Sequence, residues 1–160
     1  RLTVSARDIC ARVHEADSLR LVVDEVENVT DVLDEGAFLL SLVPKSDQTV
    51  TLGELADLSA IVIDCTSHMI RAVEAASRLP LGHRSDAAEA LQAIDAVIDA
   101  ERRADTAQRH AFSAFMGEST PDARGLVLRL EIARTLETAT DHLAHAALSL
   151  RDRVLEELSA

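Results

Sequence analysis

Pairs of acidic side chains four residues apart recur three times in this chain. One pair stands in the stretch LETATDHL at 136–143, and a second stands in the similar stretch VENVTDVL at 26–33. The third pair is the Glu and Asp of ERRAD at 101–105. Residues i and i+4 share one face of a helix, so each pair would present two carboxylates within reach of one cation. The spacing predicts either a metal site or a solvated acidic stripe.

Helical bundles build metal sites from carboxylates on facing helices, and such oxygen ligands bind hard or borderline cations. A single acidic pair is usually a solvated surface feature, so the metal interpretation depends on several pairs acting together. His145 follows Asp141 by four residues. It could add a nitrogen ligand or orient a carboxylate from outside the site. The alternative is an ordinary surface histidine.

Other chemistry has little support in the sequence. A ferritin-type di-iron oxidase needs Glu-x-x-His pairs, and no Glu here has a His three residues later. The five glycines are scattered, so no phosphate-binding loop is present. Cys10 and His14 share a helical face, but zinc would need two further ligands there. We therefore predict that the protein is not an enzyme.

The composition favours one acidic helical domain of 160 residues. With three Phe, no Trp and no Tyr, the core must consist of Leu, Val, Ile and Ala. The net charge of −12 argues against nucleic-acid binding and favours cations or basic partners. Two cysteines without a disulfide framework fit a cytoplasmic location. No apolar run is long enough for membrane insertion, and no signal peptide is visible.

Four helices are expected, at about 5–43, 51–79, 85–117 and 121–159, because apolar residues recur at three-and-four spacing between breakers. Pro44 should end the first helix, Thr51 should cap the second, and Gly117 should end the third in a left-handed conformation. Helices joined by short loops pack as antiparallel neighbours. The predicted fold is an all-α, elongated antiparallel bundle of long helices.

The first and last helices share an internal repeat within their apolar frame. The identical polar residues are Glu27, Thr30 and Asp31 in one copy and Glu137, Thr140 and Asp141 in the other. Such a repeat predicts two related helical units. Residues 1–44 would be the last helix of a first unit, and residues 51–160 would form a complete three-helix second unit. Two helices of the first unit would then be missing upstream.

The acidic segments resemble those of PhoU-type proteins, which carry E(D)xxxD motifs on two helices of each three-helix, spectrin-repeat-like unit. IDAERRAD at 98–105 resembles the family's IDDEIDxLE type of segment. LETATDHLAHAALSL at 136–150 and VENVTDVLDEGAFLL at 26–40 resemble its DLERIGDHAVNIAE type. The region at 24–31 also resembles LDDVVDxID of a PhoU-like subfamily linked to Pit-type phosphate transporters. The resemblance covers nearly the whole chain.

This resemblance implies a cytoplasmic regulator of phosphate transport that contacts a membrane transporter or its sensor and binds iron or zinc. The fourth acidic motif is absent, so one expected cluster would lack half its ligands. The more complete site would combine the pairs at 101–105 and 137–141. The metal ligands implied by the resemblance are Glu27, Asp31, Glu101, Asp105, Glu137 and Asp141.

Two alternatives from other functional classes remain open. The same carboxylates could serve a metal-dependent hydrolase or oxidase, which requires an open coordination position and a substrate pocket. The chain could also be a helical interaction module without a ligand. That interpretation predicts an exposed apolar stripe on the first helix, which could drive homodimerisation.

Overall fold

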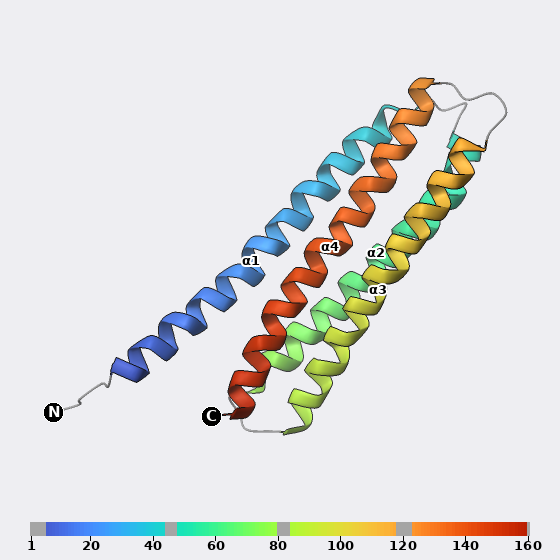
Figure 1. Cartoon of the computed structure of the whole chain (residues 1–160). Coiled ribbons are helices and arrows are strands. Elements are labelled where there is room, and N and C mark those ends of the chain that lie inside the picture. Colours follow the sequence, from blue (N-terminus) through green and yellow to red (C-terminus); the bar gives the residue numbers. More distant parts are fainter. Residues whose placement is uncertain (1–5, 44–47, 80–83, 118–122, 160) are drawn as a thin grey trace.

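The chain forms four long helices that alternate in direction (Figure 1). The computed structural model describes residues 6–43, 48–79, 84–117 and 123–159, with side chains placed from residues 17, 53, 85 and 123 onward in these segments. The helices are α1 (Ala6–Ser41), α2 (Gln48–Ser77), α3 (Arg84–Met116) and α4 (Ala123–Ser159). No strand occurs among the described residues, so the predicted all-α antiparallel bundle is confirmed.

Helix α4 is the element against which the other three are arranged. Helices α2, α3 and α4 pack against one another as a three-helix group, whereas the described part of α1 packs closely against α4 alone. Figure 1 shows α4 between α1 on one side and the α2–α3 pair on the other. The division into two PhoU-like units stays a prediction.

The core is built from small and branched aliphatic side chains that repeat at helical spacing. Alanines line the buried face of α3, and their size lets neighbouring helices approach closely. Polar side chains inside the bundle are satisfied locally. The buried Thr140 hydroxyl, for example, donates to the Glu137 carbonyl at 2.7 Å. The largest fully buried side chains are Leu58, Cys65, Ile94, Val97, Thr140 and Val154.

A glycine marks the closest approach of α1 to α4. A Cβ atom added at Gly36 would lie 3.0 Å from the Thr135 hydroxyl oxygen. That hydroxyl is buried and donates to the Ile132 carbonyl at 2.9 Å, so it is not free to move aside. Glycine in a helix interior costs roughly 1 kcal/mol relative to alanine. The close packing of these two helices explains why the residue stands there.

One side of α1 leaves apolar side chains uncovered. Val22 and Val29 are buried, but Val26 is 42% exposed and Phe38 is 61% exposed. Two adjoining apolar grooves run between α1 and α2, and residues of α4 form part of their lining. None of the described helices has an apolar segment long enough to cross a bilayer. The exposed apolar stripe expected on the first helix is therefore present.

Two details of the predicted helix ends were wrong. Helix α2 begins at Gln48, so Thr51 lies inside it and does not cap it. No Pro or Gly separates positions 48–51, and a helix extends readily through such residues. Helix α3 does end before Gly117, whose N–H donates to the carbonyls of Ser113 and Ala114 at 3.1 Å. The φ angle of Gly117 nevertheless lies outside the left-handed region, so this residue is not a left-handed cap. The predicted stop at Pro44 lies outside the described residues.

Candidate functional site

The acidic motifs of α3 and α4 face each other. Because the two helices are antiparallel, Glu101 comes near Asp141 and Asp105 comes near Glu137. Burial, followed by the charges of Asp141 and Asp105, raises the pKa of Glu101. Burial and the same two aspartates also raise the pKa of Glu137, to which Glu101 adds a smaller effect. The structure therefore brings four of the six predicted ligands into one electrostatic cluster.

Polar neighbours partly neutralise this cluster. Gln108 of α3 donates from Nε2 to Oε2 of Glu137 at 3.2 Å, and Arg109 donates to Asp105 at 2.7 Å. Glu101 and Asp141 instead line a groove of about 580 Å³ between α3 and α4. The side chain of His145 lines the same groove. This half of the cluster is the part that an ion from solvent reaches most directly.

The four carboxylates lie near one another without enclosing a single point. In the described part of the chain, no three of them place ligand atoms within 4.8 Å of one another. The donor set consists of oxygen atoms, which suits a hard cation. This spacing fits an ion that retains water or more than one ion, because coordinated water can complete the ligand shell.

The third predicted pair does not join this cluster. Glu27 and Asp31 are both exposed on α1. The described residues bring no third metal-ligating side chain into a compact group with them. The glutamate of α1 that faces α4 is Glu25, two positions earlier. The first copy of the sequence repeat therefore contains the same acidic residues as the last copy. Among the described residues, however, α1 has no second acidic helix opposite them.

A different group of side chains lies where α1 meets α4. Glu25, His142 and His145 place one ligand atom each within 4.8 Å of the others. The shortest separation joins Oε2 of Glu25 to Nδ1 of His142 at 2.6 Å. Burial raises the pKa of Glu25, but hydrogen bonds from His142 and Asn28 outweigh burial and leave that pKa lowered. An ionised carboxylate accepts, so the Nδ1–H of His142 is the donor.

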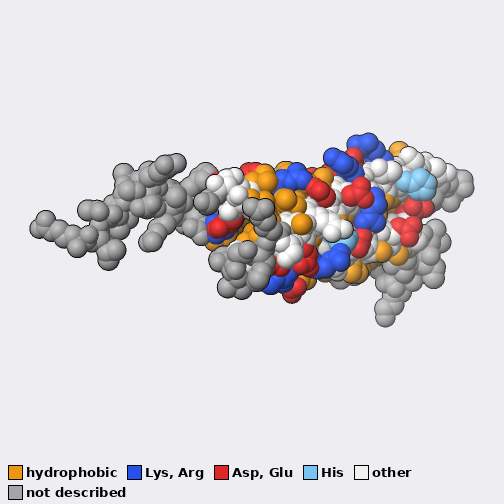
Figure 2. Space-filling view, turned by 90° about the horizontal axis from the view of Figure 1, so that it is seen from below, with side chains coloured by type: hydrophobic (Ala, Val, Ile, Leu, Met, Phe, Trp, Pro, Cys, Tyr) orange, Lys and Arg blue, Asp and Glu red, His pale blue; other side chains and the backbone are white. Residues whose placement is uncertain are grey.

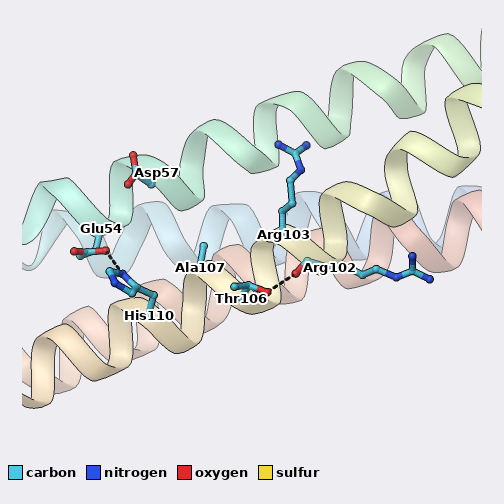
Figure 3. Close-up of a pocket in the computed structure, with 7 residues that line it drawn as sticks. All are labelled: Glu54, Asp57, Arg102, Arg103, Thr106, Ala107 and His110. Atoms are coloured by element: carbon cyan, nitrogen blue, oxygen red, sulfur yellow. Dashed lines mark hydrogen bonds and ion pairs between the residues drawn. The ribbon is translucent and has the colours of Figure 1, made fainter.

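The groove between α2 and α3 is lined by His110, and no second histidine is among the described residues that line it (Figure 3). His110 points toward Glu54, with Nδ1 3.2 Å from Oε2. Arg103 extends toward α2 in the same view and bonds to Asp64 at 2.5 Å. The hydrogen bond from Arg103 is the main cause that lowers the pKa of Asp64. These contacts are ion pairs between helices and provide a comparison for the Glu25 cluster.

One face of the molecule mixes both signs of charge with apolar side chains. Figure 2 shows acidic, basic and hydrophobic groups interspersed on one face of the molecule. The described residues on this face do not form the continuous basic patch that a nucleic acid requires. The acidic cluster between α3 and α4 is distinctive because the charges of Asp105 and Asp141 help to raise the pKa values of Glu101 and Glu137.

Sequence reasoning missed Glu25 and His142. The i,i+3 spacing of His142 and His145 in HLAH was a usable signal, since it places both imidazoles on one face of a helix. Nothing in the sequence fixed which face of α1 would meet them. Neither a family model, nor a curated protein, nor a solved structure matches this chain. The PhoU-like assignment rests on the motifs and stays a prediction.

Proposed function

We propose that this chain is a PhoU-like regulator of phosphate transport, which acts in the cytoplasm by contact with a membrane transporter or its sensor. The likeness of its acidic motifs to those of that family supports the proposal. The observation that carries it is that the motifs of α3 and α4 face each other. Glu101 and Glu137 could have projected from opposite sides of the bundle, where no ion could bridge them. Instead, each lies close enough to Asp105 and Asp141 for the charges of these aspartates to raise its pKa.

A cation at this cluster would act as a structural element of the regulator. Four like charges at a helix interface repel one another, and an ion that binds the folded state stabilises it by mass action. Glu101, Asp105, Glu137 and Asp141 would hold the ion. The resemblance implies iron or zinc, and an oxygen donor set favours the harder of the two, iron.

The apolar grooves between α1 and α2 support action by protein contact. They adjoin at Leu33 and combine residues of α1, α2 and α4. The apolar face of an amphipathic helix is the kind of partner segment that such a groove accommodates. A regulator that docks on a transporter would thus keep its cation between α3 and α4 and its contact surface between α1 and α2.

Metal analysis of protein purified without chelator tests the cation site. Asp105→Asn combined with Asp141→Asn should remove bound iron and abolish the rise in melting temperature that iron or manganese gives the wild type. The matched control is Glu27→Gln with Asp31→Asn, which changes an acidic pair of the same spacing that has no facing pair. Equal metal content in the wild type and both variants would contradict the cation site.

Phosphate uptake by cells of the source organism tests the regulatory role. A strain that lacks this gene should show altered phosphate uptake, and the wild-type gene should restore it. The Asp105→Asn, Asp141→Asn gene should fail to restore it while the control pair succeeds. Uptake that does not respond to loss of the gene would rule out a role in phosphate transport, whatever the metal analysis gives.

The exposed apolar stripe on α1 favours a second candidate, a helical interaction module without any ligand. Phe38 and Val23 are 61% and 63% exposed, and Val23 lines one of the apolar grooves between α1 and α2. This candidate predicts a melting temperature that is insensitive to every metal. It also predicts concentration-dependent association, which Phe38→Ser should weaken. Metal-dependent stability would decide in favour of the first candidate.

A further inference from the structure

We propose that Glu25, His142 and His145 form a zinc-type site that joins α1 to α4, separate from the carboxylate cluster of α3 and α4. The two imidazoles stand one helical turn apart on α4, and the carboxylate comes from the facing helix. Their ligand atoms all lie within 4.8 Å of one another, and among the described residues no other three side chains of metal-binding type meet so closely. Two nitrogens and one oxygen form a donor set that zinc accepts.

The distances require only a small adjustment. Ligand atoms about 2.0–2.1 Å from a tetrahedral zinc lie roughly 3.3 Å from one another. Glu25 Oε2 and His142 Nδ1 are 2.6 Å apart, because a proton lies between them. A zinc ion that replaces this proton would need the pair to separate slightly. His145 would need to move inward, and its exposed ring has room to rotate.

The surroundings also favour a cation at this position. The side chains of Glu25 and His142 are 24% and 25% exposed, so the pair is partly removed from water but still reachable. His145 interacts electrostatically with Glu25 of α1 and also with Glu101 of α3. It therefore stands between two carboxylates of neighbouring helices. Three protein ligands leave one position of a tetrahedral ion for water.

The competing explanation is a plain ion pair between Glu25 and His142, and His145 separates the two explanations. Its ring makes no hydrogen bond to Glu25 or His142 among the bonds that the described residues form. The ion-pair explanation therefore leaves His145 as a nearby charge and not as a direct partner of Glu25. The zinc site requires it as a ligand. His145→Ala should also leave the fold intact, because the side chain is exposed.

The test titrates the full chain, freed of metal by chelator, with Co²⁺ as a visible probe and then with Zn²⁺ in competition. We expect one Co²⁺ with strong ligand-field absorption that Zn²⁺ abolishes. Loss of even an outer partner costs ~10–100-fold in metal affinity. His145→Ala, His142→Ala and Glu25→Gln should therefore each weaken zinc binding by about 100-fold or more. Circular dichroism confirms that each variant is folded.

His110→Ala is the matched control, because it removes a histidine paired with a glutamate across two helices where no second imidazole is near. Its zinc affinity should equal that of the wild type. Unchanged zinc affinity in His145→Ala and His142→Ala would overturn the proposal. Glu137→Gln with Asp105→Asn should leave the Co²⁺ spectrum unaltered. If that variant loses iron but still binds zinc, the two metal sites are independent of each other.

Discussion

Gln108 donates a hydrogen bond from Nε2 to Oε2 of Glu137 across 3.2 Å, and so joins α3 to α4 beside the carboxylate cluster. This bond opposes the effect of burial and of neighbouring aspartates, which raise the pKa of Glu137. The amide supplies a neutral donor where a fifth carboxylate would add to the repulsion. Position 108 therefore controls how much negative charge the cluster must tolerate without a cation.

Gln108→Glu should destabilise the metal-free protein at pH 7. It removes a hydrogen bond worth about 0.5–1.5 kcal/mol and adds a like charge near Glu137. Manganese or iron should recover more stability in this variant than in the wild type. Gln92→Glu, at an exposed position of the same helix, is the control and should change stability little. Urea unfolding with and without metal measures both effects. An equal metal response in the two variants would disprove the role of position 108.

Stability should fall as the pH rises above about 4.5, the ordinary pKa of a glutamate. Glu101 and Glu137 have raised pKa values in the folded chain, so the folded state holds their protons to higher pH than the unfolded state does. Their contribution to the free energy of unfolding is fully present below their pKa in the unfolded chain. It is lost as the pH rises through their pKa in the folded chain. Glu101→Gln with Glu137→Gln should remove this loss and be more stable than the wild type at neutral pH.

Two other carboxylates have the opposite effect on the pH dependence of stability, and their effect occurs at lower pH. Glu25 and Asp64 have lowered pKa values, so their contribution is present above the unfolded pKa and is lost on acidification. Thermal unfolding without metal between pH 3 and 8 should therefore give a maximum in mildly acid solution. In the Glu101→Gln, Glu137→Gln protein the fall on the alkaline side should vanish while the acid side remains. A flat wild-type profile would contradict these assignments.

Gly36→Ala should destabilise the protein by about 1 kcal/mol, because the new methyl group would press on the buried hydroxyl of Thr135. Gly53→Ala is the matched control in α2. A Cβ there meets nothing within 4 Å, so the change should stabilise by roughly 0.5–1 kcal/mol through helix propensity. Adding Thr135→Ala to Gly36→Ala should relieve the clash. Denaturant midpoints of the wild type, Gly36→Ala, Thr135→Ala and the double variant form a double-mutant cycle, and zero coupling would disprove the close approach.

Cys65 should be inert to thiol reagents in the folded protein. Burial, helped by the charge of Asp64, raises the pKa of its thiol to about 12, and the side chain is fully buried. The thiolate is the reactive form. In a Cys10→Ser background, labelling at pH 8 should occur only through unfolding and should speed up with urea as the unfolded population grows. Rapid labelling without denaturant would show that the core opens locally around α2 and α3.

The fold was predictable because apolar spacing and helix breakers both act locally. Long three-and-four patterns between Pro, Gly and polar segments leave few alternatives to four helices. Helix ends were less predictable, as Thr51 shows, since several neighbouring residues can serve as the first turn. The facing of Glu101 and Asp141 followed from antiparallel packing of two amphipathic helices whose acidic pairs lie beside their apolar faces.

The Glu25 cluster could not be predicted in the same way. Its geometry depends on the rotation of α1 about its own axis, and that rotation is set by packing against α4. Gly36 and Thr135 help to fix it, yet a glycine in a helical sequence indicates only a local cost. The repeat pointed to Glu27 as the counterpart of Glu137, whereas the glutamate of α1 that contacts α4 is Glu25.

The packing of α4 against the other three helices limits which substitutions the protein can accept during evolution. A substitution on α1 or α2 disturbs one or two neighbouring elements, whereas α4 must remain compatible with three. A smaller share of its positions is exposed than along the described part of α1, so fewer of its substitutions should be neutral. A library of random variants selected for folding should accept far more diversity along α1 than along α4.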